Sequence, residues 1–238
     1  MTELRQALEA ADASLRRAVD GASLSALSDA DLMSHGGRIE AVARLLDAAR
    51  VLHAAEVARR AETRPGMVAA FGFRGPVDAV AGVMGISGGA ARQRIRTGTA
   101  ITQIVSPSGA VTQPRFPIIA SAVRAGSIGV EAAGLMVAQL QTASPRVDPA
   151  VLRAAEESLV DAAAGDENRP PLTVDLVRGR AAAVVAEIDP DGLRARDERA
   201  RSRRSLRFGR EDSDGLTPVH GSLLPSSRHD SEGCATHT

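Results

Sequence analysis

Alanine and leucine recur at helical spacing along most of this 238-residue chain, whereas large aromatic side chains are rare. Aromatic residues make up 2% of the sequence, with four Phe and no Trp or Tyr. The core must therefore be built from Ala, Leu, Val and Ile, and Ala-rich segments strongly favour the helix. A chain of this length can bury such a core in one or two domains. The composition thus predicts a mainly α protein.

Helical periodicity and helix-breaking residues divide the chain into a series of expected helices. The first covers residues 3–19, is amphipathic, and belongs to an N-terminal segment of residues 1–23. The other expected helices cover residues 38–62, 76–84, 88–104, 116–124, 129–140, 150–164 and 174–188.

Capping residues mark where several of these helices begin. Ser28, with Asp31 three residues later, resembles a capping box and predicts the start of a long helix. Gly36-Gly37 predict an interruption of that helix before its main part. Asp148 and Thr173 can cap the helices that follow them.

The C-terminal part of the chain predicts a different kind of structure. An acidic turn, Asp189-Pro190-Asp191-Gly192, leads into an arginine-rich helical run. Two extended runs within about residues 205–223, separated by Asp214-Gly215, predict a hairpin. Residues 226–238 are rich in Ser, Gly and Asp without periodicity, so we expect a disordered tail. The predicted fold is an irregular multi-helix assembly with a small C-terminal β-hairpin.

Two absences exclude classes of chemistry. All 29 basic residues are Arg, so a Walker-type phosphate loop and a pyridoxal phosphate Schiff base lack their Lys. Cys234 is the only cysteine, which excludes an intrachain disulfide and a multi-cysteine zinc site. No apolar run reaches the ~18 residues of a membrane span, and the N-terminus lacks an apolar signal-peptide centre. We expect a cytoplasmic protein that has no cofactor and does not enter a membrane.

Residues 77–96 resemble a helix-turn-helix, with a Gly in the turn and an Arg-rich second helix. Positions 92 and 96 share one face of that helix, whereas Arg94 points roughly opposite and is expected to pair internally. Arg92 and Arg96 are therefore the candidate nucleic-acid-binding residues, and DNA is the candidate partner. An ordinary helical hairpin inside a bundle explains the same pattern, so both interpretations stay open.

The distribution of charge leaves the same two interpretations open. Between residues 64 and 130, seven Arg stand against one Asp, although the whole chain has a net charge of zero. A basic middle can mark a surface that faces a polyanion. It can equally reflect charge pairing inside a helical bundle. Residues 120–135 carry a fainter copy of the helix-turn-helix pattern.

The order of these elements over residues 24–225 resembles a domain of unknown function, family 222. The block from Glu187 to Pro225 is the most specific part of the resemblance, together with Arg59-Arg60 and the turn at Ile86-Ser87. In that family the domain is mainly actinobacterial and usually precedes a C-terminal HNH endonuclease module. Residues 226–238 are too short for such a module, so the resemblance implies a truncated member. A frameshift, an early stop and an authentic end all remain open.

An HNH site needs histidines for the metal and the general base, and commonly an Asn that orients the base. Asn168 is the only Asn and is far in sequence from any His, while His229 and His237 lie in the expected tail. The sequence therefore assigns no catalytic and no metal-binding residue.

Two classes of function remain. The first is a non-catalytic helical domain of an HNH-endonuclease-like protein that lacks its nuclease module and is associated with nucleic acid. The alternative is a helical protein-interaction or structural domain with no nucleic-acid role. No constellation of residues supports an enzyme in its own right.

Overall fold

The computed structural model describes residues 2–21, 23–105, 109, 111–210 and 213–222. The expected tail, residues 226–238, lies outside the described residues.

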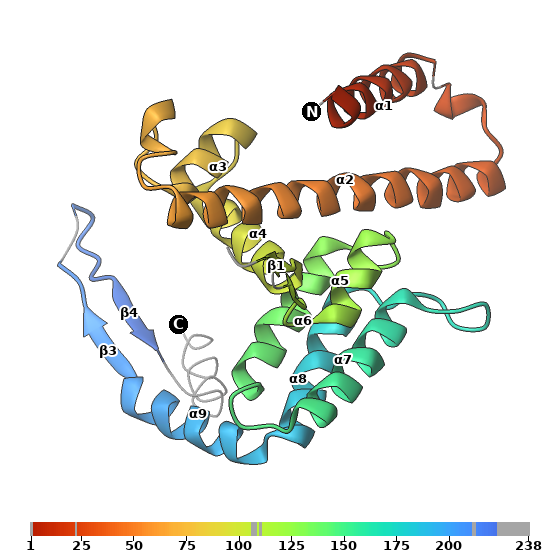
Figure 1. Cartoon of the computed structure of the whole chain (residues 1–238). Helices are drawn as coiled ribbons and strands as arrows, with labels where there is room; N and C mark the ends of the chain where they lie inside the picture. The colour runs from red at the N-terminus through yellow and green to blue at the C-terminus, as the bar shows by residue number, and fades with distance from the viewer. Residues whose placement is uncertain (1, 22, 106–108, 110, 211–212, 223–238) are drawn as a thin grey trace.

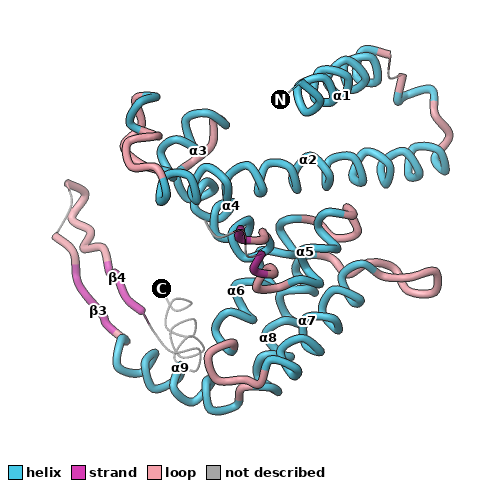
Figure 2. The backbone as a smooth tube through the Cα atoms, in the orientation of Figure 1, coloured by secondary structure: helices cyan, strands magenta, loops and turns pink. Residues whose placement is uncertain are grey.

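Helices dominate the described part of the chain, as the composition predicts (Figures 1 and 2). The α-helices are α1 (Thr2–Asp20), α2 (Asp29–Thr63), α3 (Pro76–Met84), α4 (Gly88–Ile101), α5 (Pro117–Arg124), α6 (Val130–Ala143), α7 (Pro149–Ala164), α8 (Val174–Ile188) and α9 (Pro190–Arg203). The strands are β1 (Ile104–Val105), β2 (Val111–Thr112), β3 (Ser205–Phe208) and β4 (Val219–Ser222). Short 3-10 turns cover Leu24–Ala26 and Ala69–Phe71.

The predicted caps hold the helix starts. The Ser28 hydroxyl accepts a hydrogen bond from the backbone N–H of Asp31 at 3.1 Å, and Asp148 and Thr173 cap α7 and α8 in the same way. The expected interruption at Gly36-Gly37 is wrong, because α2 runs unbroken through both glycines. A mid-helix Gly costs only about 1 kcal/mol relative to Ala, which a well-capped helix of 35 residues tolerates.

The predicted C-terminal hairpin is present. β3 and β4 pair antiparallel, from Ser205 opposite Ser222 to Phe208 opposite Val219, and their residues are exposed. Gly215 in the connecting loop has a φ of 77°, a conformation that favours glycine. Figure 1 shows α9 leading away from the helical body, so that the hairpin stands apart from it.

A second small hairpin was not predicted. β1 and β2 pair antiparallel in the connection between α4 and α5, and each has two residues. A two-residue strand is too short to produce a hydrophobic alternation that a sequence pattern can reveal.

The main core surrounds α6, which contacts α2, α4, α5, α7 and α8. Phe116, at the start of α5, is fully buried together with Ile119, Met136, Leu140 and Leu159. The remaining core positions are filled largely by Ala and Val. This composition confirms that the chain builds its interior with almost no aromatic residues.

A smaller cluster joins the second half of α2 to α3 and α4. Ala54, Val80 and Ala91 are buried at its centre, and half-buried apolar residues of the three helices surround them. Gly98 of α4 lies so close to α2 that a Cβ there would overlap the Val51 carbonyl oxygen. The close approach of these two backbones fixes the position of α4 on α2.

In the part of the chain that the structure describes, no helix has the length and apolar character that a membrane crossing requires.

Candidate nucleic-acid interface

The segment expected to form a helix-turn-helix does form two helices around a tight turn. α3 ends at Gly85, which has a φ of 64°, and the N–H of Ile86 donates to the carbonyl oxygen of Ala81 at 3.0 Å. Ser87 then caps α4, because its hydroxyl accepts from the N–H of Ala90 at 3.1 Å. Three residues therefore separate the helices, which is the spacing of a helix-turn-helix.

The inner face of this unit packs on α2. Val77, Met84 and Ile86 on the α3 side, with Ile95 on α4, surround the small buried cluster. Arg94 turns toward α3 as well, and its Nη1 lies 3.1 Å from the sulfur of Met84. The expectation that Arg94 makes an internal contact is confirmed, although the partner is a thioether rather than a carboxylate.

The outer face of α4 carries the two candidate arginines. Arg92 and Arg96 are both exposed and lie one helical turn apart. Gly89 and Thr99 continue the same exposed stripe toward the two ends of α4. Within the described residues, no ion pair joins Arg92 or Arg96 to a carboxylate, and Arg96 donates instead to the side chain of Gln93. The structure thus brings the two predicted residues onto one open surface.

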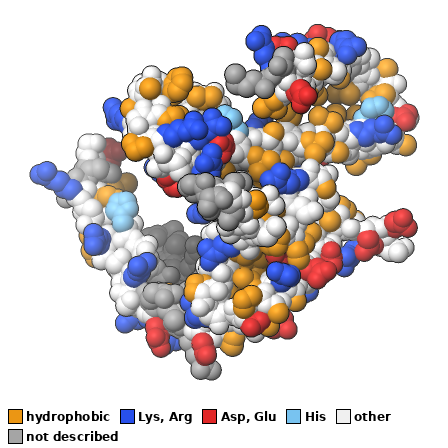
Figure 3. Space-filling model, in the orientation of Figure 1, with side chains coloured by type: hydrophobic (Ala, Val, Ile, Leu, Met, Phe, Trp, Pro, Cys, Tyr) orange, Lys and Arg blue, Asp and Glu red, His pale blue; other side chains and the backbone are white. Residues whose placement is uncertain are grey.

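More positive charge lies beside α4. Arg64 at the end of α2 and Arg74 before α3 are exposed, and Figure 3 shows arginines gathered over this end of the molecule. Asp78 is an acidic residue of this region, and its carboxylate accepts from the backbone N–H of Arg74 at 3.0 Å. Part of its hydrogen-bonding capacity is therefore used by the turn before α3.

The basic stripe ends where α4 meets a groove of mixed charge. A cavity of about 200 Å³ between the ends of α2 and α4 is lined by Glu56, Arg59 and Glu62 from α2 and by Thr99 from α4. Hydrogen bonds from Arg59, and then from Arg60, lower the pKa of Glu56 to about 2. Glu56 is therefore ionised at neutral pH and is paired with both arginines, so the groove beyond Arg96 carries charges of both signs.

The fainter helix-turn-helix pattern, residues 120–135, lies in the core. Ile119, Ala120, Ala122 and Val123 of α5 are buried, and α6 is enclosed by its neighbours. A helix enclosed in this way cannot enter a DNA groove, so this second pattern does not describe a surface element.

A buried carboxylate that the sequence did not single out lies on α7. Glu156 is 2% exposed and accepts hydrogen bonds from the backbone N–H groups of Ile118 and Ile119, at 2.7 and 2.8 Å. Burial raises the pKa of Glu156, and the two hydrogen bonds and the charge of Arg153 oppose that rise. The N-cap of α5, Phe116, has no side-chain acceptor. Glu156 therefore caps α5 from another helix.

The acidic turn at residues 189–192 is a joint between α8 and α9. The Asp189 carboxylate accepts from Gly192 N–H at 3.0 Å, which caps α9, and also from the guanidinium of Arg146. These hydrogen bonds from Arg146 lower the pKa of Asp189, whose side chain is 6% exposed. A Cβ at Gly192 would overlap the Asp189 carboxylate, so the motif requires glycine there. The joint fixes the direction in which α9 leaves the body.

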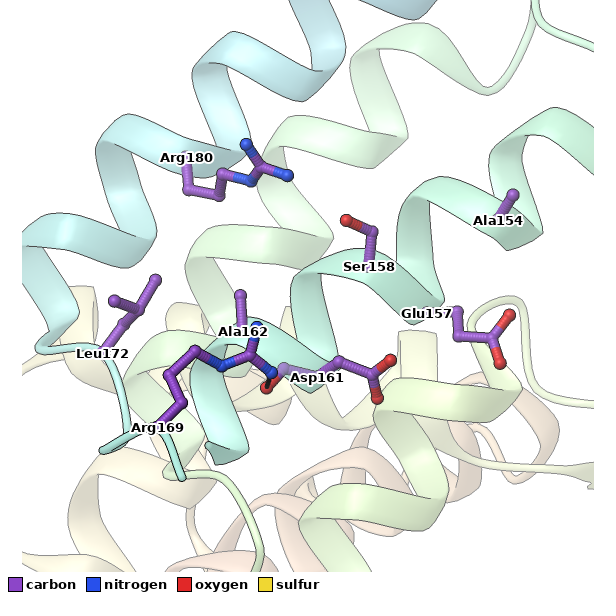
Figure 4. Close-up of a pocket in the computed structure, with 8 residues that line it drawn as sticks. All are labelled: Ala154, Glu157, Ser158, Asp161, Ala162, Arg169, Leu172 and Arg180. Atoms are coloured by element: carbon purple, nitrogen blue, oxygen red, sulfur yellow. Dashed lines mark hydrogen bonds between the residues drawn. The ribbon is translucent and has the colours of Figure 1, made fainter. Parts of the chain in front are cut away.

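A broad groove of about 540 Å³ runs along α7 and α8 (Figure 4). Glu157 and Asp161 stand on its α7 side, Arg180 projects from α8, and Arg169 reaches in from the loop between the helices. The Arg169 guanidinium donates to the backbone oxygen of Asp161 at 3.3 Å. These charges are mixed in sign and belong to an open surface. Across the described residues, no three His, Cys, Asp or Glu side chains gather closely enough to hold a metal ion.

Comparison with known proteins gives relatives but no described activity. Residues 34–233 match the family described as "Domain of unknown function (DUF222)". The uncharacterized protein Rv1945 of Mycobacterium tuberculosis (strain ATCC 25618 / H37Rv) is 28% identical over 228 residues, which is 95% of this chain and 47% of the relative. The uncharacterized protein Mb1179c of Mycobacterium bovis (strain ATCC BAA-935 / AF2122/97) gives the same figures. The chain therefore spans about half the length of these curated relatives. No solved structure matches it.

The family match runs from within α2 to α8 and continues through the Asp189 joint, α9 and the hairpin. It therefore includes the block from Glu187 to Pro225, the most specific part of the resemblance. The chain belongs to the DUF222 family.

Proposed function

We propose that this chain is the non-catalytic helical domain of an HNH-endonuclease-like protein, and that it contacts DNA through α3 and α4. One observation carries the proposal: Arg92 and Arg96 stand exposed, one turn apart, on the open face of the second helix of a helix-turn-helix. Such a face can place guanidinium groups on phosphates or base edges in the major groove. A protein with this role would meet bacterial DNA in the cytoplasm.

The start of α4 also favours contact with DNA. Gly88, Gly89 and Ala90 have little or no side chain, so a phosphate can approach the backbone closely. The N-terminus of a helix carries a partial positive charge that favours an anion. Arg92 follows within the first two turns, which places it beside a phosphate bound there.

In this proposal the chemistry belongs to the part of the longer relatives that this chain does not span. The described residues supply binding and position, and the joint at Asp189 sets the direction of α9 and of the hairpin relative to α4. A role in protein interaction without nucleic acid is the second candidate. The apolar surface of α1 and the first half of α2 favours it.

The test replaces the two arginines together. We expect Arg92→Ala/Arg96→Ala to weaken binding of a labelled DNA duplex, and to reduce the slope of log affinity against log salt by about one for each lost phosphate contact. Fluorescence anisotropy over a series of salt concentrations measures both quantities. Because the two side chains are exposed, we expect the free energy of unfolding to change by less than about 0.5 kcal/mol.

The matched control is Arg178→Ala/Arg180→Ala on α8. It removes two positive charges from the exposed face of another helix, where Arg178 makes a surface pair with Asp175. We expect this variant to bind nearly as the wild type does. An equal loss of DNA affinity in both variants would show that binding depends only on the net charge of the protein. A wild type that does not bind DNA at low salt would contradict the proposal.

A further inference from the structure

The N-terminal part of the molecule exposes an unusual amount of apolar surface. Among the described residues, ten large apolar side chains between residues 4 and 45 are exposed, with Leu4 at 69%, Val19 at 74% and Met33 at 77%. Met33 and Leu45 lie on other faces of α2, and the remaining eight expose on the order of 800 Å², about what each partner of a standard-size protein interface contributes. Apolar patches larger than a few hundred Å² mark interaction sites on soluble proteins.

The apolar residues follow a coiled-coil spacing. On α1 they occur at positions 4, 8, 11, 15 and 18, which are Leu, Leu, Ala, Leu and Ala. On α2, positions 32, 39, 42 and 46 are Leu, Ile, Val and Leu, and His35 occupies the one polar place in this register. Alternating steps of three and four residues give the narrow seam along which helices pack knobs into holes. A seam on both helices provides the surfaces that a four-helix bundle needs.

The two seams face each other without closing. α1 runs back over the first half of α2 (Figure 1), and the space between them is an apolar groove of about 560 Å³. Leu15 and Val19 line one side of it, and Ile39, Val42 and Leu46 line the other. Residues 29–40 of α2 are exposed on every side. One copy of the chain therefore leaves both seams uncovered.

The charges of this region oppose a second copy of the same chain only weakly. Between residues 2 and 46, seven acidic residues stand against five Arg, so two copies meet with a net charge of only −2 each. The charges of α1 are paired along the helix itself, as Arg5 with Glu9 and Arg16 with Asp12. These pairs lie beside the α1 seam, and Arg38 is the charged residue among those that line the groove. A two-fold arrangement places each apolar seam against an identical one, which is the usual geometry of a homodimer.

We infer that α1 and the first half of α2 form a self-association surface, on which the same segments of a second copy pack to complete a four-helix bundle. The inference stands apart from the proposed DNA contact, because α4 lies at the other end of α2. In such a dimer the two α3–α4 units are presented as a symmetric pair.

Sedimentation equilibrium on the full chain tests the inference. We expect the wild type to convert from monomer to dimer between about 1 and about 100 µM. Leu8→Glu/Leu15→Glu places two charges in the α1 seam, and we expect it to raise the dimer dissociation constant at least about tenfold. The matched control is Gln6→Glu/Ala13→Glu, which adds two acidic residues to the opposite face of the same helix. We expect the control to dimerise as the wild type does.

Each other outcome overturns the inference. A wild type that is monomeric at about 100 µM would show that the seam does not bind a second copy. A Leu8→Glu/Leu15→Glu variant that dimerises normally would show that the chains associate through another surface. Circular dichroism of both variants separates loss of association from loss of folding. The main core, from Ala48 onward, does not include α1, so we expect both variants to unfold at the wild-type temperature when all are measured below about 1 µM, where the wild type is monomeric.

Discussion

Glu156 shows how a single buried residue can hold two helices together in this protein. The start of α5 leaves backbone N–H groups unpaired, as every helix start does, and the Glu156 carboxylate on α7 takes two of them. The interaction joins residues that are 38 positions apart, and it lies at the edge of the main core. A carboxylate at this place costs solvation free energy but avoids the larger cost of two unpaired buried donors.

The first prediction compares two substitutions at this residue. Glu156→Ala removes both acceptors, so we expect the free energy of unfolding to fall by about 1–3 kcal/mol. Glu156→Gln keeps one acceptor oxygen, so we expect it to retain most of the stability. Urea denaturation of the two variants and of the wild type measures the difference. Equal losses in both variants would show that the carboxylate charge, rather than the cap, is what α5 requires.

The same pair of proteins has a defined pH dependence. Because burial raises the pKa of Glu156, the folded state binds the proton more tightly than the unfolded chain does. The stability that protonation contributes is complete below the unfolded pKa, about 4.3, and is lost as the pH rises through the folded pKa. Gln cannot lose a proton, so the stability of Glu156→Gln relative to the wild type should increase from pH 4 to pH 7. Using this difference cancels the opposite contributions of Glu56 and Asp189, whose pKa values are lowered.

At the scale of elements, the crossing of α2 and α4 depends on the absence of a side chain at Gly98. A Cβ there would overlap the Val51 carbonyl oxygen and lie 2.9 Å from the Cβ of Ala55. Backbone atoms cannot move aside as the end of a flexible side chain can. The two helices reach this distance only because position 98 is glycine, and α4 carries the candidate arginines on its opposite face.

We therefore expect Gly98→Ala to destabilise the protein by about 1–3 kcal/mol, although Ala favours the helix more than Gly does. Thermal unfolding followed by circular dichroism measures the change. Gly179→Ala on α8 is the control, because nothing lies within 4 Å of its added Cβ. That variant should gain about 0.5–1 kcal/mol. A neutral or stabilising Gly98→Ala would mean that α4 can shift on α2 at little cost.

The sequence predicts the elements of this molecule better than the contacts between them. Ser28, Ser87 and Thr173 act on backbone groups three residues away, so each helix start is visible in a short window of sequence. The partners of Glu156 and Arg146 lie 38 and 43 residues away, and no local pattern shows them. Glu156 does leave one signal, a charged residue inside the apolar stripe of α7. Helix geometry places Arg92 and Arg96 on one face of α4, whereas their exposure and the mixed-charge groove beside them depend on how α4 packs on α2.

At the scale of the whole molecule, Asp189 joins the arm formed by α9 and the hairpin to the body. β3 and β4 pair with each other and are exposed, while Asp189 is buried and binds both Arg146 and the start of α9. The body should therefore be insensitive to loss of the hairpin but sensitive to loss of the joint. Two truncations separate these effects, because one ends after Arg203 and keeps Asp189, and the other ends after Ile188 and removes it.

We expect the chain that ends after Arg203 to unfold within about 1 °C of the wild type, since both strands that it loses are exposed. The chain that ends after Ile188 loses the cap and leaves the Arg146 guanidinium without its carboxylate partner. Loss of this pair, in which Arg146 is partly exposed, costs about 0.5–2 kcal/mol, which lowers the melting temperature of a chain of this size by roughly 2–6 °C. Differential scanning calorimetry distinguishes the two results. If removing the hairpin alone lowers the melting temperature as much, the hairpin packs on the body in solution, and the arm cannot move as an independent unit.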